Sequence, residues 1–227
     1  MATPKQHSEM ESELARAVPQ IEARSSQLLS ALSEIEVLVL RSPKEFAATQ
    51  DSFALNVAGR LISQIEDALS PGYDENTCIV LLRVLRGMCL LHRPSRHLFD
   101  SDLPLQTLLA GVKHKRPEIQ VSVIDTLVAV LVHHVEAIRR FEMLGGPKFI
   151  CDVFKQSRTP TAVKLAILQF LFFYLVPETR YPNSQQKPPR LTTHDKQAIL
   201  GRYLSNVDGL VRELEMNKPF GSEPIEW

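Results

Sequence analysis

The sequence has little glycine, few cysteines and no excess of either charge. Its 227 residues include nine glycines, three cysteines and a single tryptophan. The scarcity of glycine and the near absence of apolar–polar alternation exclude a mainly β protein. Lysine and arginine together number 26, as do aspartate and glutamate, so the formal net charge is zero. Nucleic acid and anionic membranes select basic surfaces, so neither is expected as the main partner.

Recognisable catalytic and metal-binding motifs are also missing. Cys78, Cys89 and Cys151 are odd in number, far apart and set in apolar helical patterns. They are therefore predicted to be buried thiols in a reducing compartment and not disulfides or zinc ligands. His133 and His134 are adjacent, so their side chains diverge by about 100° around a helix and cannot hold one ion. No HExxH, CxxC, GxSxG or phosphate-loop pattern is present, which predicts no metal, no cofactor and no enzymatic activity.

Long apolar runs are absent too. Charged residues interrupt every apolar stretch before it reaches the ~20 residues of a membrane span. The first ten residues are polar and do not resemble a signal peptide. These features predict a soluble cytoplasmic protein without a membrane span.

What the sequence does contain is apolar residues at three- and four-residue spacing, which indicates helices almost throughout. Residues 1–24 are expected to be partly helical and 217–227 to be a tail. Residues 25–216 are expected to form one helical domain, interrupted by a proline-rich loop at 177–191. The predicted helices cover 14–18, 25–40, 53–69, 76–91, 95–99, 105–113, 118–134, 135–144, 147–156, 161–176 and one last helix from Thr192 to Pro219. Pro19 is expected to break or kink the first helix.

The helical pattern repeats with a period of about 42 residues, which is typical of armadillo and HEAT repeats. This shift moves Leu82, Leu85 and Phe99 onto Ile124, Leu127 and Phe141. A further shift of similar length places Leu165, Leu168 and Phe172 at the positions of Ile124, Leu127 and Leu131. Gly145-Gly146 provides a sharp turn between two helices of the second copy. The pattern predicts an all-α, armadillo/HEAT-like superhelical stack of helices.

Candidate partner-binding residues follow from this architecture, because the last helix of each repeat lines the concave surface of an armadillo stack. The polar candidates there, together with two arginines at a repeat edge, are Gln106, Lys113, His114, Lys148, Asp152, Lys155, Arg139 and Arg140. The same residues are also compatible with an ordinary solvated rim. Phe220 and Trp227 either cover an apolar end of the stack or form an exposed docking element.

Several segments resemble one protein family. They are Phe141–Phe154, Val163–Glu178, Lys196–Gly201 and Ser205–Val211, and the likeness extends roughly from Phe53 to Leu214. The family is the fungal cell division control protein fourteen family, the component of the septation initiation network and not the phosphatase that shares its name. The resemblance implies a non-catalytic subunit that binds and supports a germinal-centre-type protein kinase at the spindle pole body during septation. The alternative hypothesis is a general armadillo-type adaptor that binds a linear peptide of a cytoskeletal or transport partner; the oligomeric state is open.

Overall fold

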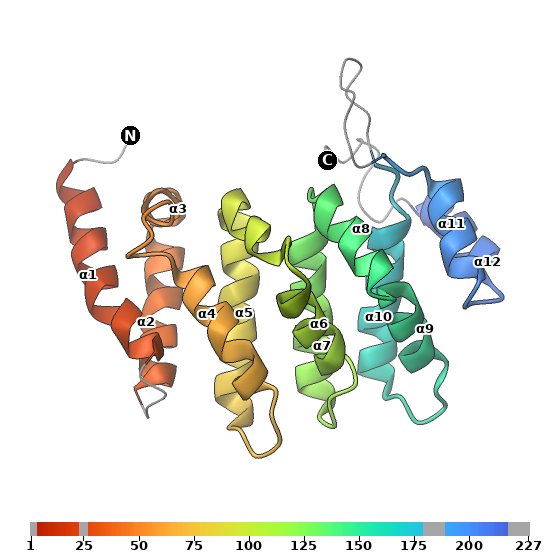
Figure 1. The fold of residues 1–227 in the computed structure, drawn as a ribbon, viewed down its shortest axis with the longest axis horizontal. Coiled ribbons are helices and arrows are strands. Elements are labelled where there is room, and N and C mark those ends of the chain that lie inside the picture. Colours follow the sequence, from red (N-terminus) through yellow and green to blue (C-terminus); the bar gives the residue numbers. More distant parts are fainter. Residues whose placement is uncertain (1–3, 23–26, 179–188, 218–227) are drawn as a thin grey trace. The chain divides into compact units, whose positions relative to one another are not determined.

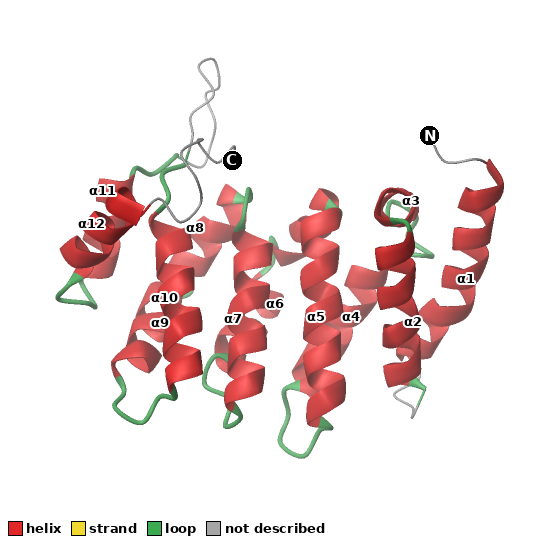
Figure 2. Cartoon of the chain, turned by 180° about the vertical axis from the view of Figure 1, so that it is seen from behind, coloured by secondary structure: helices red, strands yellow, loops and turns green. Residues whose placement is uncertain are grey.

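The computed structural model describes residues 4–22, 27–178 and 189–217 of the chain (Figure 1). Within these ranges every regular element is helical, with twelve α-helices, one 3-10 helix and no strand (Figure 2). The all-α prediction is therefore confirmed. The chain divides into two compact units, residues 1–108 and 109–227, which are described in turn. A superhelical armadillo or HEAT arrangement and a single 25–216 domain stay predictions.

The first unit is built around one long apolar helix. Its elements are α1 (Pro4–Glu22), α2 (Leu28–Arg41), α3 (Pro43–Thr49), α4 (Val57–Ala68), α5 (Glu75–Leu91), the 3-10 helix η1 (Arg93–Phe99) and most of α6 (Asp102–Gly111). Helix α5 packs against α2, α3, α4 and η1. Its Leu81 and Leu85 are fully buried, as are Leu61 of α4 and Phe99 of η1. Because four elements cover α5, its apolar residues extend over most of its circumference.

Side-chain caps set the start of two helices in this unit. The Asn56 side chain accepts a hydrogen bond from the Gly59 N–H at 2.8 Å and begins α4. The Asp74 carboxylate accepts from the Thr77 N–H at 2.8 Å and begins α5. Each cap satisfies a backbone donor that has no partner within the first helical turn.

The N-terminal helices differ from the prediction in two ways. Helix α1 continues through Pro19 to Glu22, so the break expected there does not occur, and a kink at Pro19 stays a prediction. Proline removes one backbone hydrogen bond, but Val18 and Ile21 on either side of it are buried and hold the helix in place. Helix α3 was not predicted, because Pro43 was interpreted only as a stop; proline also suits the first turn of a new helix, and Phe46 anchors this one in the core.

Two apolar residues of the first unit lie outside its core. Leu40, which belongs to the apolar spacing of the helix predicted over residues 25–40, is 80% exposed, whereas Leu38 is buried. The predicted helix from residue 53 begins only at Val57, and Phe53 is 91% exposed. The Gln50 side chain accepts the Val57 N–H at 2.9 Å, which fixes the chain in a turn before the helix.

The second unit is organised around α10. Its helices are α7 (Pro117–Leu131), α8 (Val135–Met143), α9 (Gly146–Lys155), α10 (Thr161–Leu175), α11 (Thr193–Gly201) and α12 (Val207–Asn217). Helix α10 packs against α7, α9, α11 and α12. Its C-terminal half is buried on nearly all sides, and Phe170, Leu171 and Tyr174 are almost inaccessible.

The predicted turn between α8 and α9 is confirmed, and glycine is required at its two positions for different reasons. Gly145 has a φ of 77°, in the left-handed region that favours glycine. Gly146 has an ordinary φ, but a Cβ there would overlap the buried ring of Phe141. One glycine therefore allows the turn and the other allows close packing.

Two predictions in the second unit are wrong in register. Leu165, which was aligned with core residues of α7, is 55% exposed. A shift of 44 residues matches the burial instead, since it aligns Ile119, Val123 and Leu127 with Val163, Ile167 and Leu171, all buried. The single helix predicted after Thr192 is two helices, because the chain leaves α11 at Arg202 and starts α12 at Val207. Ser205-Asn206 lies between them, and both residue types favour turns and caps over helix interiors.

Candidate partner-binding surfaces

One surface carries several of the predicted binding residues, and it lies on α9. Lys148, Asp152 and Lys155 follow one another at helical spacing, so they share a stripe of this helix. The Asp152 carboxylate accepts from the Lys148 ammonium at 2.6 Å and lies 3.6 Å from the Lys155 ammonium. The hydrogen bond from Lys148 lowers the pKa of Asp152, and Asp152 raises the pKa of Lys148. The side chains of Lys148 and Lys155 are 60% and 51% exposed, so both remain accessible.

Lys113, which follows α6 in sequence, joins this surface through a ring contact. Its ammonium lies 4.2 Å from the centroid of the Phe149 ring on α9, a cation–π geometry. Lys113, Lys148, Asp152 and Lys155 are here called the α9 polar face. The neighbouring His114 is half-buried, and its Nδ1 accepts the Arg116 N–H at 3.1 Å. The structure thus brings together four of the predicted residues and turns His114 partly inward.

Gln106 is exposed on α6, in the first unit. Arg140 is half-buried on α8. Phe220 and Trp227 lie outside the described residues, so their predicted role stays a prediction.

Arg139 is the predicted binding residue whose placement differs most from expectation. Its side chain is 15% exposed and forms ion pairs with Glu142 and Glu178. Glu178 is fully buried and also pairs with the equally buried Lys196 at 3.1 Å. The Tyr174 hydroxyl donates to Glu142 at 2.6 Å. Arg139 therefore belongs to an interior cluster of charges, called here the buried ion network, and not to a free surface.

The buried ion network connects α8, α10 and α11. The Lys196 ammonium, on α11, also donates to the Val176 carbonyl just after α10, at 2.8 Å. Glu178 and Leu191 exchange two hydrogen bonds, at 3.0 Å between backbones and 2.9 Å from the Leu191 N–H to the carboxylate. Burial lowers the pKa of Lys196, and the carboxylate of Glu178 opposes that effect. Because two cations face two carboxylates, the cluster is neutral, as buried charges require. Among the described residues one donor of the cluster, the buried Arg139 Nε, has no hydrogen-bond partner.

Sequence reasoning missed the network for an identifiable reason. Arg139 and Glu142 are three residues apart on a helix, which is a readable signal for a local ion pair. Glu178 and Lys196 are separated by the loop, and no local spacing relates them.

A basic side chain just after α5 is likewise internal. Arg96 is 4% exposed, and its Nε donates to the Cys89 carbonyl at 2.6 Å, close to the C-terminus of α5. Burial lowers the pKa of Arg96. The predicted burial of the three cysteines is confirmed, and burial raises the pKa of Cys78 to about 11 and that of Cys89 to about 12. Thiols with such pKa values are poor nucleophiles at neutral pH.

The fold and these surfaces define a class: an all-α protein of packed helices with an ion network inside and polar side chains on the outer face of α9. Among the described residues no helix has the length and apolar character needed to cross a membrane. The sequence matches the profile of the family described as Cell division control protein 14, SIN component, over residues 3–190 and 182–220.

The chain belongs to this family and is thus a cell division control protein, a component of the septation initiation network. It is 34% identical over 193 residues to Cell division control protein 14 of Schizosaccharomyces pombe, with 79% of each chain covered. The resemblance found in the sequence is confirmed. No solved structure matches the chain.

Proposed function

We propose that this protein is a non-catalytic scaffold or activating subunit for a germinal-centre-type protein kinase of the septation initiation network. Membership of the family is the observation that carries the proposal. The chemistry of the chain supports it. The thiols are buried and protonated. The charged groups of the buried ion network are paired with one another inside the protein. Binding, and not bond-breaking, is the activity to which these features are suited.

In this proposal the protein acts in the cytoplasm and at the spindle pole body, where it supports the kinase during septum formation. The test is to co-express the full chain with the germinal-centre-type kinase of its own septation cascade. We expect a stable complex on gel filtration and higher phosphorylation of a model substrate than the kinase alone produces. If the two proteins never co-elute and the kinase rate is unchanged, the proposal is wrong.

The second candidate is a general adaptor that binds a linear acidic peptide, and the α9 polar face favours it. Two lysine ammonium groups flank the Asp152 carboxylate there and a third, that of Lys113, lies over the Phe149 ring, so the face carries a net positive charge. Reversing two of these charges, with Lys113→Glu and Lys148→Glu, is expected to abolish peptide binding without unfolding the exposed helix face. Binding of the kinase that survives this double variant would separate the two functions.

A further inference from the structure

The α9 polar face carries more positive charge than its own residues neutralise. Its three ammonium groups belong to Lys113, Lys148 and Lys155, and its one carboxylate belongs to Asp152. Within the described ranges these lysines form no ion pair with any other acidic residue. The face therefore keeps a formal charge of +2, and the side chains of Lys148 and Lys155 are more than half exposed.

Two of the cations converge on one place and are not spread along the helix. Lys148 Nζ lies 2.6 Å from one Asp152 oxygen, and Lys155 Nζ lies 3.6 Å from the other. Both lysines reach the same carboxylate because residues four and three apart on a helix share a face. The face thus already holds one oxyanion between two cations, and its remaining charge allows a second, more highly charged oxyanion beside it.

Donors from two other segments of the second unit border the same stripe of α9. The Lys113 ammonium lies 4.2 Å from the Phe149 ring centroid, and this uncharged ring positions the cation without neutralising it. The pKa of Lys148 is raised by Asp152 and, more weakly, by Tyr203 of the turn after α11, so the Tyr203 phenol lies near this ammonium. A neutral tyrosine hydroxyl can donate a hydrogen bond to an anion. Three separate segments therefore present donors on this face.

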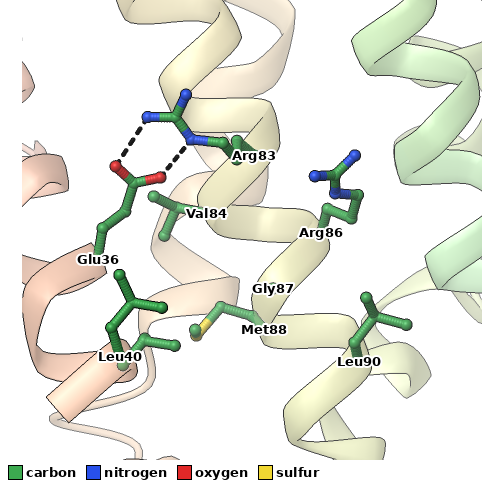
Figure 3. Close-up of a pocket in the computed structure, with 9 residues that line it drawn as sticks. Glu36, Leu40, Arg83, Val84, Arg86, Gly87, Met88 and Leu90 are labelled. Carbon is green, nitrogen blue, oxygen red and sulfur yellow. Dashed lines mark hydrogen bonds and ion pairs between the residues drawn. The ribbon is translucent and has the colours of Figure 1, made fainter. Parts of the chain in front are cut away.

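The groove between α2 and α5 of the first unit differs from this face in its charges. It has a volume of about 490 Å³ and is bordered by Gly87 of α5 (Figure 3). At its edge the Arg83 guanidinium and the Glu36 carboxylate form a two-bonded ion pair, so this cation is already matched by an anion. An anionic occupant gains more at the α9 polar face, where two positive charges remain beyond the one carboxylate.

A phosphate monoester complements the α9 polar face. It carries a charge of about −1.5 to −2 at neutral pH and has three strong acceptor oxygens. One such group offsets the +2 charge of the face, whereas one carboxylate offsets half of it, and lysine binds phosphate as a point charge. Nucleic acid gains its affinity from many phosphate contacts, which the zero net charge of the chain does not favour. The charge of the face therefore selects a single phosphorylated side chain.

We infer that the α9 polar face binds a phosphorylated serine or threonine of the partner kinase, with Lys113, Lys148 and Lys155 as the cations that hold the phosphate. This inference rests on the proposed function, and it names the chemistry of the segment that the kinase presents. A protein kinase brings this chemistry itself, because phosphorylation of its own activation loop is a common way of ordering that loop. The acidic peptide of the second candidate is then a phosphorylated segment of the kinase.

The experiment compares two forms of one kinase. The autophosphorylated kinase and the same kinase after treatment with a protein phosphatase are each titrated onto the full chain, and the dissociation constants are measured by calorimetry. We expect phosphatase treatment to weaken binding at least about tenfold, because the charge-assisted hydrogen bonds to the phosphate are lost.

Three variants test whether the phosphate is held by the α9 polar face. Lys148→Gln combined with Lys155→Gln removes the two converging cations; it should weaken binding of the phosphorylated kinase at least about tenfold and leave binding of the dephosphorylated kinase unchanged. Lys44→Gln, at an exposed lysine of α3 in the first unit, is the matched control and should change neither dissociation constant. Asp152→Asn raises the formal charge of the face to +3 and should tighten binding of the phosphorylated form about threefold. The altered side chains lie at the surface, so the urea midpoints should stay close to that of the wild type.

The outcomes separate the inference from the function on which it rests. If both kinase forms bind with equal affinity, or if the double lysine variant binds the phosphorylated form as well as the wild type does, the inference is overturned and the proposed function stands. If the two forms bind equally and the double lysine variant instead loses binding to phosphatidylserine vesicles, the face belongs to a membrane and the inference is overturned. If the unaltered chain binds neither form, both proposals fall.

Discussion

Two arginine–glutamate pairs in this molecule have the same chemistry and very different surroundings. In the second unit, Arg139 and Glu178 are 15% and 0% exposed and share their charges with Lys196 and Glu142. In the first unit, Arg83 and Glu36 are 49% and 27% exposed and pair only across the mouth of a groove. The interior pair has lost its hydration and depends on its partners, whereas the surface pair remains screened by water.

The comparison shows that the two units use their charged residues differently. In the second unit the charges fix which helix ends meet, because each member of the network would be an uncompensated buried charge without the others. In the first unit the charges lie at the surface, paired with each other beside exposed apolar residues, and the core does not depend on them. The two pairs have the same chemical groups, so the difference between them comes from the burial of their side chains.

The largest expected effect comes from removing the centre of the network. Glu178→Ala leaves Lys196 buried without a carboxylate and removes one of the two partners of Arg139, so it should cost about 3–5 kcal/mol of unfolding free energy. Urea denaturation followed by circular dichroism measures this loss. As a control, Glu178→Leu combined with Lys196→Met removes both buried charges and should recover much of it. A loss no larger than that of a surface pair would contradict the comparison.

A smaller effect is expected at the surface pair. A double-mutant cycle with Glu36→Ala and Arg83→Ala should give a coupling free energy below about 1 kcal/mol, because both side chains are solvated and screened. The coupling should shrink further in about 0.5 M salt, where the Debye length is only a few ångströms. A coupling free energy as large as that of the buried network, or one that does not change with salt, would mean that solvent exposure does not set the contribution of these ion pairs to stability.

The smallest effect concerns an exposed charge whose partners are local. The Thr77 hydroxyl and N–H donate to Asp74 at 2.7 and 2.8 Å and lower the pKa of its carboxyl. The folded-state pKa is below the unfolded value, so this stabilisation is present above about pH 4 and is lost as the pH falls through the folded pKa. Asp74→Asn keeps a capping acceptor, so unfolding measured between about pH 5 and 2 should show a shallower acid loss than in the wild type. Parallel pH curves for the two proteins would contradict this assignment.

Much of the fold could be predicted because its signals are local. The apolar spacing of residues 76–91 predicts α5 almost to the residue, since Glu75–Leu91 is observed. Gly145-Gly146 predicts the turn that the φ of 77° confirms. The last predicted helix was expected to start at Thr192, and Thr192 is indeed the N-cap of α11, where it forms a capping box with Asp195. The α9 polar face could be anticipated for the same reason, because residues four and three apart on a helix share a face.

The rest required contacts between segments distant in sequence. A helical pattern shows that Leu38 and Leu40 lie on different sides of α2, but only the packing of α1 and α5 against it decides that Leu38 is the buried one. No local sequence pattern predicts the buried ion network, because Glu178 contacts Lys196 only when α11 packs on α10.

The sequence by itself determined an all-α chain, most helix boundaries and the family, because these depend on backbone propensities and residue order along a single chain. The tertiary structure decided that Arg139 turns inward, that Pro19 is tolerated within α1 and that Gly87 borders an open groove. These outcomes depend on which surfaces exclude water together, and the free energy of excluding water belongs to the packed neighbours and not to any one segment.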